Sequence, residues 1–283
     1  MNIKHIVIVG AGTMGNGIAQ TAAVSGYRVT MTDIAQEYLD RAKATIARSV
    51  DRLAGKGTIS AAQKEAALGI ATAPNLEPVA TADMVIEAAT EDPDLKLQLF
   101  TQLDRLAPTG VILASNTSSI SLTKIASATA RPDRVIGMHF FNPVPLMKLL
   151  EVIRGLATSD ETATAATEVG RKMGKEPIEA KDSPGFISNR ILCPMINEAI
   201  FALQEGIGTA EAIDNVMRLG MNHPMGPLTL ADMVGLDVVL FVMEVLHRDM
   251  GEDKYRPAPL LRKMVDAGYL GRKSGRGFYT YTN

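Results

Sequence analysis

Residues 4–33 read KHIVIVGAGTMGNGIAQTAAVSGYRVTMTD, and their pattern indicates the architecture of the first half of the chain. A short apolar run leads into a glycine-rich turn. A helical pattern follows and stops at Gly26, after which a second run rich in β-branched residues ends at Asp33. A buried strand, a helix and a second strand in this order form a βαβ unit. We therefore expect a parallel sheet that grows outward from this unit.

The turn inside this unit has the spacing G-x-G-x-x-G, with Gly10, Gly12 and Gly15 at the three positions. The first glycine permits a tight turn, the second lets a pyrophosphate approach the backbone, and the third lets the helix pack closely on the strand. Asp33 closes the second strand, where a carboxylate accepts a hydrogen bond from a ribose 2′-OH and repels a 2′-phosphate. The pattern favours dinucleotide binding, and NAD over NADP. The alternative is a glycine turn that serves packing alone.

Helical and strand patterns continue to alternate after this unit. Residues 35–67 and 93–107 have helical spacing, whereas residues 83–89, 110–115 and 133–140 read as strands. Strands that alternate with helices are typical of a doubly wound, mostly parallel sheet. We predict an α/β, Rossmann-like NAD-binding domain over residues 1–182.

The alternation of strand and helix patterns ends near Asp182, where the segment DSPGF interrupts it. Beyond it, apolar residues recur at helical spacing over residues 186–206, 209–220, 236–250 and 258–268, and no segment reads as a strand. We expect residues 183–283 to form a smaller, all-helical second domain.

The composition excludes several classes of protein. The chain has 283 residues, of which 46% are hydrophobic and 21% charged, as in ordinary globular proteins. A net charge of −2 gives no overall field to attract nucleic acid. The single cysteine rules out an internal disulfide, and with four scattered histidines it forms no familiar metal-ligand pattern. No apolar run is long enough for a membrane span, and no leader segment is recognisable, so we expect a cytoplasmic protein.

Residues 137–152, GMHFFNPVPLMKLLEV, place a histidine and a glutamate in an otherwise almost wholly apolar run. The pattern reads as strand, turn and strand. If the chain reverses about Pro145, His139 falls opposite Glu151. A histidine among apolar residues is more often a core residue than a catalyst, so this segment by itself leaves both interpretations open.

The segment ARSVDRLAGKG carries a cluster of basic and hydroxyl side chains on a predicted helix. Ser49, Arg52 and Lys56 are spaced three and then four residues apart, so they share one face. One interpretation is that this face binds a phosphate-bearing ligand other than the dinucleotide. The other is a solvated polar helix.

Two further segments carry polar side chains where ligands bind in such folds. SNTSSIS, residues 115–121, follows a strand at the carboxyl edge of the expected sheet, where open α/β sheets bind their ligands. Ser118 could face such a ligand or cap a helix, and the same choice applies to Asn189 at the entrance of the helical domain. Cys193 lies nearby, and we expect it to be packed rather than nucleophilic.

Taken together, these segments resemble the L-3-hydroxyacyl-coenzyme A dehydrogenase family, most closely its short-chain branch. The resemblance runs nearly end to end. Seven segments carry it in order: GAGTMGNGIAQ, VIEAATED, ASNTSSIS, GMHFFNPVPLMKLLEV, KDSPGFISNRI, HPMGPLTLADMVGLDV and GRKSGRGFYTY. It implies a Rossmann-like domain, a helical domain through which subunits form a homodimer, and the NAD-linked interconversion of 3-hydroxyacyl-CoA and 3-ketoacyl-CoA thioesters. For the short-chain branch these are 3-hydroxybutyryl-CoA and acetoacetyl-CoA.

The resemblance also implies roles for individual residues. Its catalytic acid/base pair falls on His139 and Glu151, and its substrate-polarising residues fall on Ser118 and Asn189. Its remaining positions are contacts to ligands: Glu91, Lys96 and Asn142 for the cofactor, beside the glycines and Asp33, and Ser49 and Lys56 for coenzyme A. One local departure is Pro93, close to Glu91.

These residue types suit the oxidation of a secondary alcohol, in which the hydroxyl proton leaves as the hydride departs. A neutral imidazole can accept that proton, and a carboxylate on its other nitrogen orients it. Two alternatives remain. One is another NAD enzyme of similar build, such as a β-hydroxyacid or nucleotide-sugar dehydrogenase, with a lysine base or the thiol of Cys193. The other is a dinucleotide-binding structural or regulatory protein on the same fold.

Overall fold

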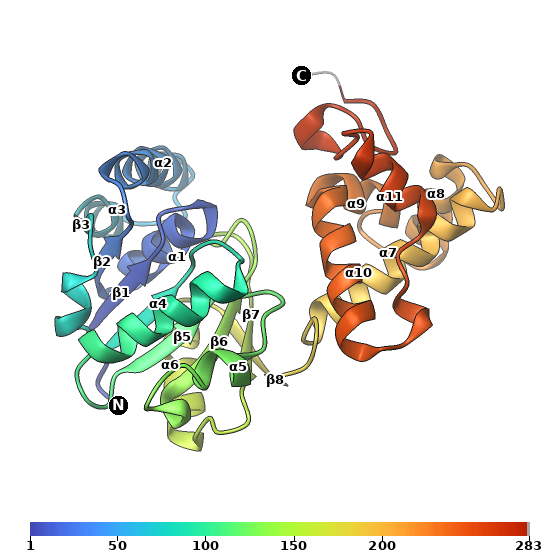
Figure 1. Ribbon diagram of the computed structural model, residues 1–283. Coiled ribbons are helices and arrows are strands. Elements are labelled where there is room, and N and C mark those ends of the chain that lie inside the picture. Colours follow the sequence, from blue (N-terminus) through green and yellow to red (C-terminus); the bar gives the residue numbers. More distant parts are fainter. Residues whose placement is uncertain (282–283) are drawn as a thin grey trace. The chain divides into compact units, whose positions relative to one another are not determined.

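The computed structural model describes residues 1–281 and divides the chain into two compact units (Figure 1). Unit 1 is Met1–Asp182, and unit 2 begins at Ser183. Unit 1 is an α/β structure and unit 2 is built from helices. The predicted fold class, a mostly parallel doubly wound sheet followed by a helical region, is confirmed.

The sheet of unit 1 has eight strands in the order β3-β2-β1-β4-β5-β6-β7-β8. All neighbouring pairs are parallel except β6 and β7, which are antiparallel. The central strands are buried, which explains their continuous apolar sequence. The strands are β1 His5–Val9, β2 Arg28–Thr32, β3 Ala71–Ala73, β4 Met84–Glu87, β5 Ile112–Ser115, β6 Val135–Phe140, β7 Leu149–Arg154 and β8 Glu176–Lys181.

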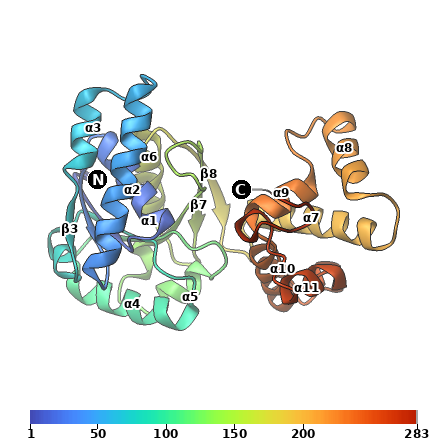
Figure 2. The same cartoon turned by 90° about the horizontal axis from the view of Figure 1, so that it is seen from above.

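Helices cover both faces of this sheet. Figure 2 shows α1, α2, α3 and α6 on one side and α4 and α5 on the other. The first side packs on one face of the strands through a single apolar cluster that includes Ile8, Ile18 and Met31. The helices are α1 Thr13–Val24, α2 Gln36–Gly55, α3 Ala61–Leu68, α4 Pro93–Leu106, α5 Leu122–Ala126 and α6 Asp160–Lys172, with 3₁₀ turns η1 Glu77–Thr81 and η2 Pro132–Arg134.

The helix expected over residues 35–67 is two helices. The chain leaves α2 at Gly57, whose φ of +69° lies in the left-handed region that glycine adopts without strain. Ser60 then begins α3 with a capping box, in which its side chain accepts from Gln63 N and the Gln63 side chain accepts from Ser60 N. Turn chemistry therefore overrides the continuous helical spacing.

Unit 2 has its own apolar core, formed by residues such as Ile196, Leu236 and Met243. Within its described residues, β-structure is limited to the bridges Gly271↔Arg276 and Arg276↔Thr280. The helices are α7 Ser188–Gln204, α8 Ala210–Gly220, α9 Pro227–Val234, α10 Leu236–Met250 and α11 Pro259–Asp266, with 3₁₀ turns η3 Asp253–Tyr255 and η4 Arg272–Ser274. The four expected helices correspond to α7, α8, α10 and α11, and α9 is an additional one.

Candidate active site and dinucleotide site

The glycine turn between β1 and α1 leaves no room for a side chain at Gly10 or Gly15. Gly10 has a φ of +108°, and a Cβ atom on it would lie 2.6 Å from the carbonyl oxygen of Ala88. A Cβ on Gly15 would lie 1.8 Å from the carbonyl oxygen of Gly10. Gly12, at the N-cap of α1, has nothing within 4 Å of its Cβ position. The backbone at the helix N-terminus is thus open to a pyrophosphate, which its N–H groups and dipole favour.

Asp33 holds this turn from the end of β2. Its Oδ2 accepts a hydrogen bond from Ala11 N at 2.6 Å, and its Oδ1 accepts from Ile34 N at 2.7 Å. The aspartate therefore does two things. It fixes the first turn residue after Gly10, and it lines the adjoining cavity.

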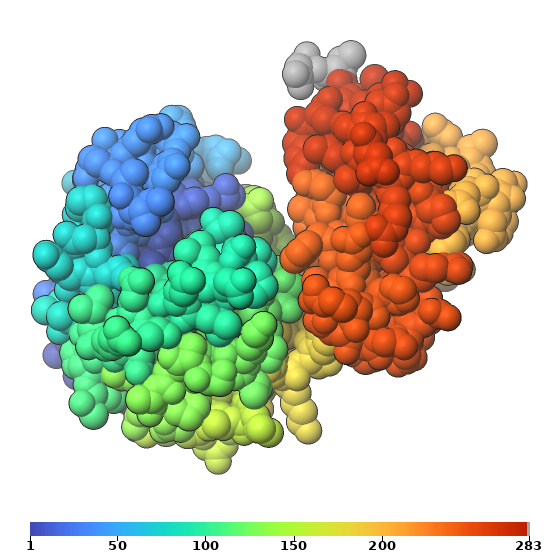
Figure 3. Space-filling view, in the orientation of Figure 1, coloured from blue at the N-terminus to red at the C-terminus, as the bar shows by residue number. Residues whose placement is uncertain are grey.

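A cavity of about 880 Å³ opens above the turn, and we call it the large cavity. Its walls come from the glycine turn, the start of α2, and the segments that follow β3 and β4, with residues Gly10, Gly12, Asp33, Arg41, Asn75, Ala89 and Gln98 among them. Figure 3 shows unit 1 hollowed between the light blue and the blue-green segments, with the dark blue glycine-turn region at the floor. The cavity has the size and the phosphate-accepting floor that a dinucleotide requires.

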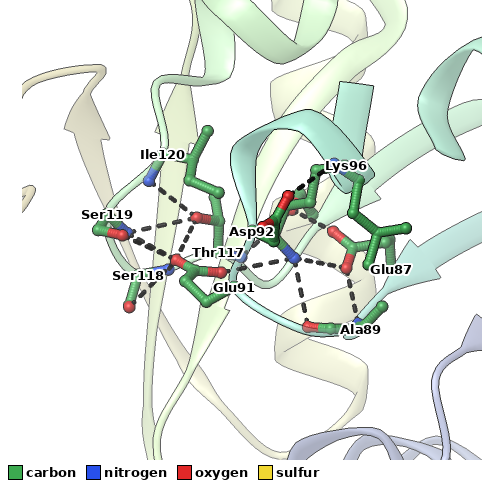
Figure 4. A network of polar contacts seen from close by, with 11 residues as sticks. Glu87, Ala89, Glu91, Asp92, Lys96, Thr117, Ser118, Ser119 and Ile120 are labelled. Atoms are coloured by element: carbon green, nitrogen blue, oxygen red, sulfur yellow. Dashed lines mark hydrogen bonds and ion pairs between the residues drawn. The ribbon is translucent and has the colours of Figure 1, made fainter. Parts of the chain in front are cut away.

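Glu91 organises the loop that follows β5, as Figure 4 shows. Its Oε1 accepts hydrogen bonds from Thr117 Oγ1 at 2.6 Å, Ser118 N at 2.8 Å and Ser119 N at 3.1 Å. Burial raises the pKa of Glu91, but the Lys96 ammonium and these donors outweigh burial, so the pKa lies below its usual value. Glu91 is therefore an anion around which the 117–119 turn is built.

Pro93 does not disturb this arrangement. It is the first residue of α4, where the missing N–H of proline costs nothing, and Asp92 caps the helix by accepting from Leu95 N at 2.8 Å. Lys96, further along the same helix, is 1% exposed. Its ammonium lies 2.6 Å from Glu87 Oε1 and 3.4 Å from Glu91 Oε2. Lys96, for which the resemblance implies a cofactor contact, is thus a buried side chain whose ammonium already pairs with two carboxylates.

His139 and Glu151 face each other across the antiparallel pair β6 and β7. The register pairs the two residues directly, as expected from a reversal near Pro145. His139 Nδ1 lies 2.8 Å from Glu151 Oε2, and the two residues are 7% and 2% exposed. A carboxylate at this distance favours the tautomer with the proton on Nδ1, in which Nε2 is the acceptor nitrogen. The imidazole also packs against the ring of Phe141, with centroids 4.6 Å apart.

The loop after β5 is tied to the histidine strand. Asn116 Oδ1 accepts a hydrogen bond from Phe140 N at 2.8 Å, next to His139. Ser118 follows in the turn held by Glu91. The 117–119 turn follows the carboxyl end of β5, and His139 lies near the carboxyl end of β6. The structure therefore brings Ser118 and His139 to one region of unit 1. Asn189 is the second residue of α7 and lies in unit 2.

A smaller cavity of about 470 Å³ adjoins the large one, and we call it the small cavity. Its walls come from α1, from α2 and from the loop after β6, with residues Thr13, Gln20, Arg48, Ser49, Arg52, Asn142 and Pro145 among them. Lys56 is exposed just past the end of α2 and does not line it. The structure therefore joins Ser49 and Asn142 at one cavity, and its positive charge comes from Arg48 and Arg52.

Cys193 belongs to the core of unit 2. It is buried, and burial raises the pKa of its thiol to about 12. A thiolate is therefore scarce at neutral pH, which disfavours the alternative with a cysteine nucleophile.

Within residues 1–281, no group of three or more His, Cys, Asp or Glu side chains is arranged to hold a metal ion. The helices of this part of the chain are also too short or too polar to cross a bilayer.

Two family descriptions match the chain. Residues 5–183 match the 3-hydroxyacyl-CoA dehydrogenase NAD binding domain, and residues 185–281 match the 3-hydroxyacyl-CoA dehydrogenase C-terminal domain.

Similar proteins cover nearly the whole chain. A probable 3-hydroxybutyryl-CoA dehydrogenase of Deinococcus radiodurans is 56% identical over 97% of this chain and 99% of its own. A probable 3-hydroxybutyryl-CoA dehydrogenase of Bacillus subtilis is 55% identical over 99% and 98%. The crystal structure of the (S)-3-hydroxybutyryl-CoA dehydrogenase of Ralstonia eutropha has a TM-score of 0.97 at 55% identity and covers 100% of both chains.

Proposed function

The chain belongs to the 3-hydroxyacyl-CoA dehydrogenase family and is an NAD-dependent oxidoreductase, and we propose that it interconverts 3-hydroxybutyryl-CoA and acetoacetyl-CoA. The observation that carries the proposal is the His139–Glu151 pair, with 2.8 Å between imidazole and carboxylate at the carboxyl edge of a sheet that also forms the dinucleotide cavity. The pair supplies the acid/base chemistry that alcohol oxidation needs.

In the direction of oxidation, His139 Nε2 accepts the proton of the 3-hydroxyl group. The glycine turn and Asp33 would hold NAD⁺, which would supply the acceptor for the hydride of the carbinol carbon. Glu151 holds the ring through Nδ1 and stabilises the imidazolium that forms. In reduction the imidazolium returns the proton to the developing alkoxide. Ser118 and Asn189 are proposed to donate hydrogen bonds to the substrate oxygens, which become more negative in the transition state.

The small cavity is the proposed place for the phosphate-bearing end of coenzyme A. Arg48 and Arg52 bring two positive charges to it, and Ser49 adds a hydroxyl donor. Guanidinium groups bind phosphate with paired hydrogen bonds and stay charged at every physiological pH. Lys56, one residue beyond α2, is proposed to add long-range attraction for the phosphate groups.

We also propose that two copies of the chain associate through unit 2. Its helix α8 and the residue after it expose large apolar side chains, among them Val216, Leu219 and Met221, which are 61%, 80% and 61% exposed. Several large apolar side chains exposed on and next to one helix favour a protein interface there.

Oxidation of NADH by acetoacetyl-CoA, followed by absorbance, tests the proposed reaction. The wild-type protein should turn over, and His139→Ala should lose nearly all of that activity while it still binds NADH. A wild-type protein that binds NADH without turnover would favour a structural or regulatory role. Turnover of free β-hydroxyacids but not of the thioester would favour the other dehydrogenase class.

A further inference from the structure

A buried glutamate of the VIEAATED segment, Glu87, lies beside Lys96 in the cluster of Figure 4. Glu87 is the last residue of β4 and is 0% exposed. Its Oε1 accepts from Ala89 N and from the Lys96 ammonium, both at 2.6 Å, and its Oε2 accepts from Ser115 Oγ at 2.6 Å. A buried carboxylate with three short charge-assisted contacts is strongly held.

The partners of Glu87 border the dinucleotide site. Ala89 lines the large cavity, and the preceding Ala88 is the residue that approaches Gly10. Ser115 Oγ in turn accepts from Thr117 N at 3.2 Å, where the 117–119 turn begins. Glu87 therefore ties the turn after β4, which forms a wall of the cavity, to the turn after β5.

Lys96 connects Glu87 to Glu91. Its one ammonium serves two carboxylates, and Glu91 uses its other oxygen to hold the 117–119 turn. A close counter-charge stabilises a buried ammonium, and Glu87 is the closer of the two carboxylates. The position of Glu91 thus depends on a lysine whose own position depends on Glu87.

We propose that Glu87 is a positioning residue for the dinucleotide site, which acts through Lys96 to set Glu91 and the 117–119 turn. The proposal rests on the NAD-dependent function but concerns cofactor binding alone. Affinity for NADH therefore tests it without a thioester substrate.

The first test is Glu87→Gln, with the NADH Kd measured by fluorescence titration. Glutamine keeps the size and can still accept from Ala89 N, but the Lys96 ammonium then lies beside Glu91 alone and draws it away from the turn. We expect the Kd to rise about tenfold, roughly the effect of one weakened charge-assisted contact. Glu91→Gln should raise it similarly. Combining the two should add less than about threefold, because both act on the same turn.

A second variant separates positioning from stability. Glu87→Gln/Lys96→Met removes both buried charges, so its Tm should recover toward the wild-type value. The NADH Kd of the double variant should stay about tenfold above the wild-type value, because Glu91 has lost the ammonium beside it.

The matched control is Asp104→Asn on the same helix α4. It breaks the 2.7 Å ion pair with Arg131, away from the large cavity, and should lower the Tm while leaving the Kd unchanged.

A Kd within about twofold of wild type in both Glu87→Gln and the double variant would reduce the cluster to a structural ion pair and overturn the proposal. Losses that simply add between Glu87→Gln and Glu91→Gln would also overturn it. Failure of the proposed reaction shows differently, as a wild-type protein that binds NADH but does not reduce acetoacetyl-CoA. If Glu87→Gln alone does not fold, Glu87→Asp, which keeps the charge but shortens the reach toward the Lys96 ammonium, provides the measurement.

Discussion

Among single residues, Glu151 is a carboxylate inside a strand pair whose other side chains are apolar apart from His139 and Arg154. It is tolerated there because His139 lies 2.8 Å away and directly opposite in the register. A buried charge without a partner would cost several kcal/mol. The same contact that makes the glutamate tolerable orients the histidine, so stability and chemistry share one interaction.

Glu151→Gln should damage turnover far more than binding. Glutamine keeps the size but removes the charge that favours imidazolium in the transition state. We expect kcat to fall by about 10² to 10⁴, as in other histidine–carboxylate pairs. The NADH affinity should stay within about threefold of wild type. Steady-state kinetics with acetoacetyl-CoA and a separate NADH titration measure the two quantities.

The matching control is the double variant His139→Ala/Glu151→Gln. Residues that act as a unit are not additive, so the double variant should be little worse than His139→Ala alone. Losses that multiply, or near wild-type turnover in Glu151→Gln, would return His139 to the role of a core residue.

Asp33 is the residue that should set the choice between NAD and NADP. It opposes a 2′-phosphate with like charge, while Arg41, which lines the same cavity, could attract one. Asp33→Asn removes the charge but keeps an oxygen that can accept from Ala11 N. We expect kcat/KM with NADPH to rise at least about tenfold. Comparable use of NADPH and NADH by the wild-type enzyme would contradict this prediction.

At the scale of elements, α2 presents one face to the small cavity. Arg52→Ala should weaken acetoacetyl-CoA binding by roughly 1 to 3 kcal/mol, the range for lost hydrogen bonds to charged groups, and leave NADH binding unchanged. Lys56→Ala should act in the same direction. Lys43→Ala is the matched control, since Lys43 is an exposed lysine of α2 that lines neither cavity. An unchanged substrate KM in Arg52→Ala and Lys56→Ala would favour the solvated-helix interpretation.

The segment after η4 is held by buried carboxylates of unit 2. Asp232 accepts hydrogen bonds from Phe278 N at 2.9 Å, Tyr279 N at 3.0 Å and Tyr281 OH at 2.9 Å. Asp232→Asn replaces an acceptor oxygen by a donor and should cost about 1 to 3 kcal/mol of unfolding free energy. Urea denaturation measures it. Asp249→Asn, at an exposed pair with Arg248, should change stability by less than about 0.5 kcal/mol.

For the whole molecule, the proposed homodimer predicts a particle mass in solution of twice that of one chain. Leu219→Glu places a charge on the exposed apolar side of α8 and should shift the protein from dimer to monomer. Sedimentation at micromolar concentration measures the change. Leu106→Glu, a partly exposed leucine at the end of α4 in unit 1, is the control and should leave the mass unchanged. A wild-type monomer would contradict the association.

Whole-chain organisation followed from local patterns wherever those patterns were strong. Apolar runs in the sequence predict the strands β4, β5 and β6, and apolar residues at helical spacing predict the helices α7, α10 and α11. The edge strand β8 was not, since EPIEAK is mostly exposed and alternates poorly. The division of residues 35–67 depended on the turn at Gly57 and the cap at Ser60, which helical spacing does not register.

Local sequence patterns were enough to predict the βαβ unit, the glycine turn with Asp33, and the opposition of His139 and Glu151, because each lies within one short βαβ or strand–turn–strand segment. The pairing of distant charges depended on tertiary packing. It placed Arg48 and Arg52 at the small cavity, and it enclosed Lys96 between Glu87 and Glu91. Ser115 is 28 residues from its partner Glu87, and Asp232 is 46 from Phe278. Such pairs are set by how strands stack and helices pack, which no short sequence pattern records.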